Sequence, residues 1–227
     1  PMTGLDHIDL AECERRNIKV ISLKGETEFL ANISSTSEHT LGLIISLARN
    51  YKSALNFPYK ERGEYVGHKL QDKCLGIVGV GRIGSDLLIS AEGLGMKVCL
   101  YDNELHGSNV LSELLKISDY VTLHIPLQDN EGFFTMDIFQ QMKPTAYFIN
   151  TSRSKIVEDG ALLWALENKK IAGAAVDFID DLELVEYART HDNLILTNHI
   201  GGCTYEDMAK TEDFIKLKVE NYLTNKV

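Results

Sequence analysis

The chain has 227 residues, of which 44% are hydrophobic and 25% are charged, and this composition is typical of a folded globular protein. Its formal net charge of -10 argues against nucleic acid or anionic lipid as a main partner, because an acidic surface repels phosphate groups. The four cysteines are widely spaced without a C-x-x-C pair, so we expect no disulfide framework, no metal site and a reducing, cytoplasmic location. The longest apolar run, residues 41–48, is far shorter than the ~20 residues that a membrane span needs.

The first part of the chain is weakly patterned. Residues 18–23 (IKVISL) predict a strand. A helix is expected over the following segment EHTLGLIISLARNY, with Thr36 or Ser37 as its N-terminal cap. The polar residues 52–72 that follow predict a loop or arm. We expect residues 1–36 to be the end of a βα domain whose beginning is absent.

The rest of the chain alternates short apolar runs with helical patterns. Strands are predicted at 75–80, 97–102, 120–125, 147–150, 172–178 and 193–197, and helices at 82–94, 109–117, 135–142, 159–169 and 204–223. Strands that are apolar throughout are buried on both faces, as in a parallel sheet covered by helices. The pattern therefore predicts a doubly wound α/β (Rossmann) domain at 37–203, followed by a C-terminal helix within 204–227.

A glycine motif, GVGRIG at 79–84, lies between the first of these strands and the next helix. Gly79 permits a tight turn, Gly81 lets the backbone approach a pyrophosphate, and Gly84 lets the helix pack on the strand. The free N–H groups and partial positive charge at the start of that helix would bind the pyrophosphate. The motif therefore predicts a dinucleotide site, although a tight βα turn without a nucleotide has the same glycines.

Three further residues extend this predicted site. Arg82 and Ile83 occupy the variable positions of the loop, where Arg82 offers a charged contact. Asp102 ends the next strand, where its carboxylate would accept hydrogen bonds from the adenosine ribose and repel a 2′-phosphate. We therefore expect NAD rather than NADP.

Several motifs in chain order carry a resemblance to a known family. They are TGLDHIDL (3–10), SEHTLGLIISLAR (37–49), GVGRIG (79–84), LHIPL (123–127), NTSR (150–153), VD (176–177) and NHIGG (198–202). With these motifs the chain resembles the D-isomer-specific 2-hydroxyacid dehydrogenases, the family of phosphoglycerate dehydrogenase and glyoxylate/hydroxypyruvate reductase. The resemblance implies a Rossmann domain beside a flavodoxin-like substrate domain and an NAD-dependent interconversion of a D-2-hydroxy acid and its 2-keto acid. It also implies a homodimer, formed through residues 37–49 and the arm after them.

The same resemblance assigns the chemistry. His199 is implied as the acid/base, because imidazole exchanges protons near neutral pH. Arg153 is implied as the cation that binds the substrate carboxylate and polarises the neighbouring carbonyl. Thr3 and Gly4 match the end of a loop whose N–H groups grip that carboxylate.

Further cofactor contacts are implied at strand ends. His124 would line the adenine side or only pack there, and Asp177 would lie near the nicotinamide carboxamide or be a solvated strand-end acid. The residues implied to contact the cofactor are His124, Pro126, Thr151, Ser152, Asp177 and Gly201. The other histidines, at 7, 39, 68, 106 and 191, are expected to be structural or on the surface.

Two of the chain's departures from the family pattern bear on the implied chemistry. Family members pair the histidine with a glutamate five residues after the Asp177 position, whereas this chain has Leu182, flanked by Asp181 and Glu183. Either acid is a candidate partner, and we favour Glu183 for its longer side chain. Most of the substrate domain ahead of Thr3 is also missing, as if an initiator methionine had been excised before residue 1 or the sequence were a fragment.

We therefore expect a dehydrogenase, with phosphoglycerate-like substrates considered first. The main alternative is a non-enzymatic NAD-binding regulatory module related to these dehydrogenases. The leucine at 182 and the incomplete substrate domain ahead of Thr3 favour it. A third interpretation, an adenosylhomocysteinase-like NAD protein, fits the NTSR and NHIGG motifs poorly.

Overall fold

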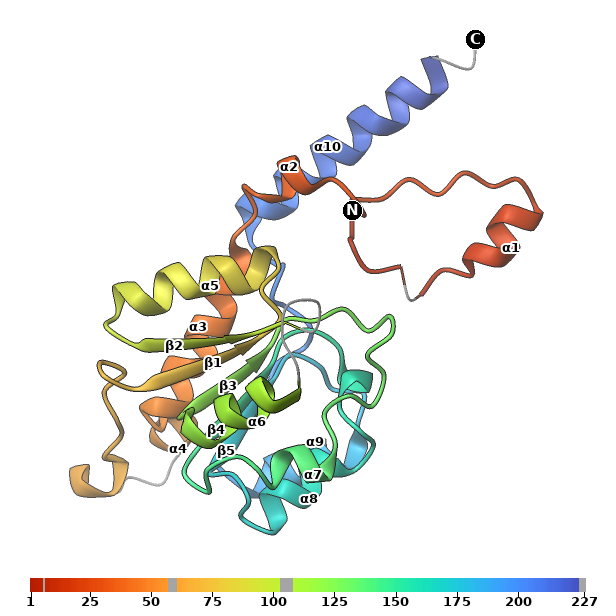
Figure 1. Ribbon diagram of the computed structural model, residues 1–227. Helices are drawn as coiled ribbons and strands as arrows, with labels where there is room; N and C mark the ends of the chain where they lie inside the picture. Colours follow the sequence, from red (N-terminus) through yellow and green to blue (C-terminus); the bar gives the residue numbers. More distant parts are fainter. Residues whose placement is uncertain (6, 57–60, 103–107, 225–227) are drawn as a thin grey trace. The chain divides into compact units, whose positions relative to one another are not determined.

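The computed structural model describes residues 1–5, 7–56, 61–102 and 108–224 (Figure 1). The chain divides into two compact units. The first consists of Pro1–Ser35 and Gly202–Val227, and the second is Thr36–Gly201. Among the described residues, no helix is both long and apolar enough to cross a membrane.

The second unit is built on one six-stranded sheet. The strands are β1 (Cys74–Val78), β2 (Lys97–Tyr101), β3 (Tyr120–Leu123), β4 (Tyr147–Asn150), β5 (Gly173–Val176) and β6 (Leu194–Leu196). All neighbours pair in parallel in the order β2-β1-β3-β4-β5-β6. All six predicted strands are confirmed, and the fold is the predicted doubly wound, Rossmann-like α/β fold.

Helices cover both faces of this sheet (Figure 1). Helices α3 (Ser35–Ala48) and α5 (Arg82–Gly93) pack on one face, and α6 (Ser108–Ile117), α7 (Met136–Phe139), α8 (Ala161–Glu167) and α9 (Leu182–Thr190) pack on the other. Short helical segments α4 (Tyr51–Leu55), η1 (Arg62–Tyr65) and η2 (Ser154–Ile156) complete the described part of the unit. The segment 52–72 therefore begins within a helix, and part of it falls outside the described residues.

The core explains why the strand sequences are apolar throughout. Ile149 packs with α3 and α5, whereas the adjacent Phe148 packs with the helices on the opposite face. Ile77 and Val78 divide in the same way, and all four side chains are fully buried. Because successive strand residues face opposite sides, burial of both faces requires an unbroken apolar run.

Some local predictions are wrong. Helix α3 begins at Ser35, so Thr36 and Ser37, which were expected to cap it, lie inside its first turn. Residues 18–22 adopt no regular structure, because the described part of the first unit offers no second strand to pair with them. Residues 182–190, for which no helix was predicted, form helix α9. The Asp181 carboxylate caps this helix by accepting hydrogen bonds from the N–H groups of Glu183 (2.9 Å) and Leu184 (3.1 Å), and Leu184 is buried.

The first unit contains α1 (Leu10–Arg15), α2 (Thr27–Leu30) and the long α10 (Tyr205–Thr224), which was predicted. Its small core consists of Leu23, Leu30 and Ile33 with the partly buried Phe29, Phe214 and Ile215. The rings of Phe29 and Phe214 stack with their centroids 3.9 Å apart. The buried Asp207 carboxylate accepts hydrogen bonds from the N–H groups of Ser34 (3.1 Å) and Ser35 (3.0 Å), so α10 also caps the start of α3. That residues 1–36 are the remnant of a substrate domain stays a prediction.

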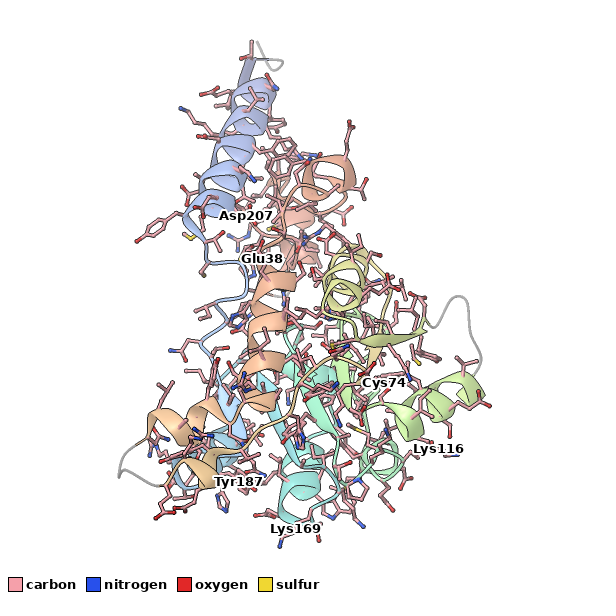
Figure 2. The ribbon with its side chains drawn as sticks, turned by 90° about the vertical axis from the view of Figure 1, so that its left-hand side faces the viewer. Glu38, Cys74, Lys116, Lys169, Tyr187 and Asp207 are labelled. Carbon is pink, nitrogen blue, oxygen red and sulfur yellow. The ribbon has the colours of Figure 1, made fainter. Side chains whose placement is uncertain are left out.

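Two of the four free cysteines lie side by side in the sheet. The Sγ atoms of Cys74, labelled in Figure 2, and Cys99 are 3.5 Å apart, and burial raises the pKa of the Cys74 thiol to about 11. Cys74 is paired in register with Lys97, two residues before Cys99. This offset puts the two Cα atoms about 8 Å apart, from strand spacings of ~3.3 Å per residue and ~4.8 Å between strands. The separation exceeds the range that a disulfide bridges, so the two partly buried thiols act as small apolar side chains.

Candidate active site at the carboxyl edge of the sheet

The candidate residues gather where the direction of winding reverses. The chain passes from β1 to the edge strand β2 and then returns to β3 on the other side of β1. Open α/β sheets bind ligands in the crevice outside the carboxyl ends of the strands at such a point. The glycine loop follows β1 and His124 follows β3, and the N–H of His124 donates to the carbonyl of Val78 (2.7 Å). Both segments therefore lie side by side at the carboxyl edge of the sheet.

Each glycine of the loop has a distinct environment. Gly79 has φ +97°, and a Cβ atom there would lie 2.7 Å from the backbone of His124. A Cβ atom at Gly84 would lie 2.2 Å from the carbonyl oxygen of Gly79, so only glycine lets α5 approach β1 this closely. Gly81 is exposed, and a Cβ atom there would have no neighbour within 4 Å. The space beside Gly81, at the start of α5, is open to a ligand.

The acid after β2 contacts this loop directly. Asp102 accepts a hydrogen bond from the N–H of Val80 through Oδ2 (3.1 Å). The carboxylate is thus held beside the glycine loop, as a ribose-binding acid must be. Arg82 and Ile83 are the first two residues of α5, and both are partly buried.

A buried asparagine shapes the loop that carries Arg153. The Asn150 side chain accepts a hydrogen bond from the N–H of Ser152 (2.9 Å) and donates one to the carbonyl of Arg153 (2.9 Å). It is fully buried at the end of β4. Asn150 therefore closes a turn that brings Arg153 to the carboxyl edge of the sheet. This role of Asn150 was not predicted, although an Asn at a strand end followed by small polar residues is typical of such turns.

The hydroxyls in this loop have structural partners. Ser152 donates to the carbonyl of Leu123 at the end of β3 (2.9 Å). The Thr151 and Thr40 hydroxyl oxygens are 2.8 Å apart, and Thr40 gives its proton to the carbonyl of Thr36 (2.8 Å), so Thr151 is the donor to Thr40. These bonds fix the loop to β3 and α3, and a contact of Thr151 or Ser152 with the cofactor stays a prediction.

The loop after β4 is also tied to the loop after β5. The Ser154 hydroxyl donates to the Asp180 carboxylate (2.5 Å), a contact that the sequence analysis did not anticipate. The loop that contains Arg153 is therefore joined to the loop that contains Asp177 at the carboxyl edge of the sheet.

Asp177 organises the turn that contains His199. It is buried at the end of β5 and accepts hydrogen bonds from the Thr197 hydroxyl (2.6 Å) and the N–H groups of Ile200 (2.9 Å) and Gly201 (2.8 Å). Burial alone would raise the pKa of this carboxyl, but the interactions with His39, Thr197 and the two N–H groups outweigh burial and lower the pKa to about 2. Asp177 is therefore not a solvated strand-end acid. A contact between it and the nicotinamide stays a prediction.

The turn held by Asp177 presents His199 at the surface. His199 is exposed and has φ +54°, a left-handed backbone conformation that is uncommon outside glycine. Of the two candidate acids, Asp181 has one carboxylate oxygen engaged with the start of α9, and Glu183 is exposed in the first turn of that helix. The pairing of Glu183 with His199 stays a prediction.

His124 lies beside the glycine loop but in apolar surroundings. Its Nε2 atom is 3.0 Å from the Thr122 hydroxyl, and burial lowers the pKa of the ring to about 4. The ring is therefore neutral at physiological pH and unsuited to hold a proton for catalysis. Pro126, two residues later, is exposed. A place for both on the adenine side stays a prediction.

The second unit thus brings together the residues predicted at the ends of all six strands: the glycine loop, Asp102, His124, the 150–153 loop, Asp177, and the turn with His199 and Gly201. Thr3 and Gly4 lie in the first unit, and their grip on a substrate carboxylate stays a prediction.

Comparison with known families decides the identity of this unit. Residues 41–201 match the family described as D-isomer specific 2-hydroxyacid dehydrogenase, NAD binding domain. The chain belongs to this family.

Relatives of the dehydrogenase chain include several named enzymes. It is 35% identical over 222 residues to a D-3-phosphoglycerate dehydrogenase of Bacillus subtilis, covering 89% of this chain and 40% of the relative. It is 34% identical over 224 residues to a glyoxylate reductase of Pyrococcus furiosus, covering 89% of this chain and 65% of the relative. The chain therefore spans about two fifths of that phosphoglycerate dehydrogenase.

A solved structure supports the same assignment. The D-lactate dehydrogenase from Aquifex aeolicus, solved in complex with NAD and lactic acid, superimposes with a TM-score of 0.77 at 29% identity. The match covers 98% of this chain and 74% of the other.

The cofactor of this 2-hydroxyacid dehydrogenase domain is NAD. The residues present fit a dinucleotide, because a Cβ atom at Gly81 would meet nothing within 4 Å and the start of α5 is therefore open for a diphosphate. The N–H groups at the start of α5 would hold that diphosphate, and Asp102 would hold the adenosine ribose.

Proposed function

We propose that the chain is part of an NAD-dependent oxidoreductase that interconverts a small D-2-hydroxy acid and its 2-keto acid. The observation that carries the proposal is that the glycine loop, the Arg153 loop and the His199 turn all lie at the carboxyl edge of one parallel sheet, after β1, β4 and β6. Phosphoglycerate-like acids are the first substrates to test, since several relatives are named D-3-phosphoglycerate dehydrogenase.

In this proposal each candidate site residue has one task. Arg153 binds the substrate carboxylate, because a guanidinium donates two parallel hydrogen bonds to a carboxylate. His199 takes the proton of the C2 hydroxyl on oxidation and returns it on reduction. Bound NAD supplies the hydride acceptor. Glu183 is our candidate to orient the His199 ring, and Thr3 and Gly4 would complete the grip on the carboxylate.

The test is NADH consumption with glyoxylate, hydroxypyruvate and phosphohydroxypyruvate. We expect the His199→Ala variant to turn over at least ~100-fold more slowly than the unchanged protein, since general acid/base catalysis contributes ~10²–10⁴-fold. His68→Ala is the matched control, because His68 is exposed and lies in the 52–72 arm, ahead of the amino end of β1. Equal rates for the His199→Ala variant and the unchanged protein would reject His199 as the acid/base.

Cofactor preference is a second test of the proposal. We expect the unchanged protein to bind NADH more tightly than NADPH, because the Asp102 carboxylate would face the additional phosphate. In Asp102→Ala we expect the preference to fall by ~10- to 100-fold, which corresponds to about 1.4–2.7 kcal/mol. Fluorescence titration with both nucleotides measures it, and an unchanged preference would remove Asp102 from the ribose site.

One observation favours a second candidate function, a non-enzymatic NAD-binding regulatory module. The side chain at 182, where family members carry the glutamate, is an exposed leucine, 81% accessible. NADH binding without turnover of any 2-keto acid, in a chain that includes a whole substrate domain, would select this candidate.

We also propose a homodimer formed through residues 37–49 and the arm at 52–72. Leu55 and Val66 in the arm are 76% and 74% exposed, and a partner that covered them would bury apolar surface. Light scattering of the unchanged protein and of a Leu55→Asp variant tests this proposal.

We also propose a cytoplasmic location, because the four cysteines are widely spaced and suggest no disulfide framework.

A further inference from the structure

His39 was expected to be structural or exposed, and it lies against the turn that carries the proposed acid/base. It projects from α3, the helix that packs on one face of the sheet, against residues of β1, β4 and β5. Its Nε2 atom is 3.2 Å from the Thr197 hydroxyl oxygen and 3.5 Å from Asp177 Oδ1. All of these residues belong to the second unit.

The direction of the hydrogen bonds follows from counting protons. The Asp177 carboxylate is ionised at neutral pH and can only accept, so the Thr197 hydroxyl gives its single proton to Asp177 across 2.6 Å. That hydroxyl oxygen can then only accept from His39. The Nε2 atom of His39 must therefore carry a hydrogen, and the chain of donors runs from His39 through Thr197 to Asp177.

Asp177 in turn holds both sides of His199. Thr197 lies two residues before His199, and the N–H groups of Ile200 and Gly201 that donate to Asp177 follow it. The turn is therefore closed by one carboxylate, with His199 at φ +54°. A non-glycine residue in this conformation costs ~1–2 kcal/mol and needs such support.

The space around Gly201 shows that α3 packs tightly on this turn. A Cβ atom at Gly201 would lie 3.0 Å from Asp177 Oδ2, 3.4 Å from Thr36 Cγ2 and 3.7 Å from His39 Cδ2. The turn thus has no room to shift toward α3. Movement of the turn would have to break the Asp177 bonds.

We propose that His39 is a positioning residue for His199, acting through Thr197 and Asp177. It donates to Thr197, keeps that hydroxyl directed at Asp177, and so fixes the backbone that aims the His199 imidazole. The inference rests on the proposed function for its consequence in catalysis, and on the geometry alone for the position of His199.

The experiment compares two variants. His39→Leu fills the space without a hydrogen-bond donor, whereas His39→Gln has an amide N–H that can reach Thr197 without an imidazole ring. The first readout is the His199 Hε1 resonance in the NMR spectrum of the full 227-residue chain, assigned by its loss in His199→Ala. We expect this resonance to move and broaden in the Leu variant and to return toward its original position in the Gln variant. His68→Leu is the control and should leave it unchanged.

The second set of readouts separates positioning from general damage. With the 2-keto acid that the protein reduces best, we expect kcat to fall about 10-fold in His39→Leu and to recover within about 3-fold in His39→Gln, while KM and the NADH Kd stay within about twofold. An unmoved His199 resonance in the Leu variant, or a Gln variant as impaired as the Leu variant, would overturn the proposal. A parallel loss of NADH affinity and unfolding midpoint would also overturn it, because it would show a merely structural residue. If the unchanged protein reduces no 2-keto acid, the proposed function fails, whereas the NMR comparison still decides the role of His39.

Discussion

Substitution of alanine for each of two glycines in the phosphate loop should separate stability from cofactor binding. In Gly84→Ala the new Cβ atom would lie 2.2 Å from the carbonyl oxygen of Gly79 and 3.2 Å from Ile77 Cγ2. Carbon and oxygen atoms in contact need more than 3 Å, so α5 must move from β1 by roughly 1 Å. Overpacking of this kind costs ~1–3 kcal/mol, and the gain from replacing a helical glycine, ~0.5–1 kcal/mol, offsets only part of it.

We therefore expect Gly84→Ala to lower the free energy of unfolding by roughly 1–2 kcal/mol, or the midpoint by ~2–8 °C for a chain of this size. Gly81→Ala should show the opposite pattern, with stability retained and NADH affinity reduced. Gly81 has φ -73°, which any residue adopts, and a Cβ atom there meets nothing within 4 Å. Its stability should stay within ~1 kcal/mol of the unchanged protein, while the NADH Kd rises at least ~10-fold because the side chain would face the diphosphate.

Urea unfolding and NADH fluorescence titration measure the two effects on the same samples. Gly93→Ala is the matched control, since Gly93 ends the same helix and a Cβ atom there has open space around it. It should be neutral or slightly stabilising and should bind NADH normally. If Gly84→Ala were as stable as the control, or Gly81→Ala as unstable as Gly84→Ala, the assignment of close packing to one glycine and ligand approach to the other would be refuted.

Two further predictions concern buried charges. The pKa of Asp177, lowered to about 2 in the folded chain, contributes about 2 kcal/mol of stability that is fully present above the unfolded pKa of ~3.9 and is lost as the pH falls toward 2. The stability difference between the unchanged protein and Asp177→Asn, measured by denaturant titration, should therefore shrink between pH 4 and pH 2, and a constant difference would contradict this. Lys52 donates to the carbonyls of Ala188, His191 (2.9 Å) and Leu194 (2.7 Å), which leaves unpaired acceptors in Lys52→Met. We expect a loss of ~1–3 kcal/mol by urea unfolding, against almost none in the exposed Lys69→Met control, and equal losses would argue against this role.

The location of Lys52 illustrates what the parallel fold implies for the edge opposite the candidate site. Crossover helices run back against the strands, so α8 and α9 end near the amino edge of the sheet. Figure 2 shows Lys169 and Tyr187, close to the ends of these two helices, at one end of the second unit. Lys52 binds the carbonyls there, and its contribution is therefore to stability rather than to the cofactor site.

The sequence by itself determined the sheet and the phosphate loop, because both depend on short segments. A strand buried on two faces must be apolar at every position, and this made each of the six strands recognisable. The loop needed glycine at three fixed spacings, for a turn at Gly79, an open approach at Gly81 and close packing at Gly84. The strand predicted at 18–23 failed on the same reasoning, since an apolar run forms a strand only where a neighbour accepts its hydrogen bonds.

Only the tertiary structure decided which polar side chains act together. Asp177, Thr197 and His39 are far apart in the sequence and belong to different elements, and no spacing rule connects them. A hydrogen-bond network forms only when the sheet and α3 are packed, because its geometry depends on distances of about 3 Å between separate segments. The sequence could name His199 and Asp177 as candidates, but the carboxylate that closes the turn and the histidine behind it became visible only in the fold.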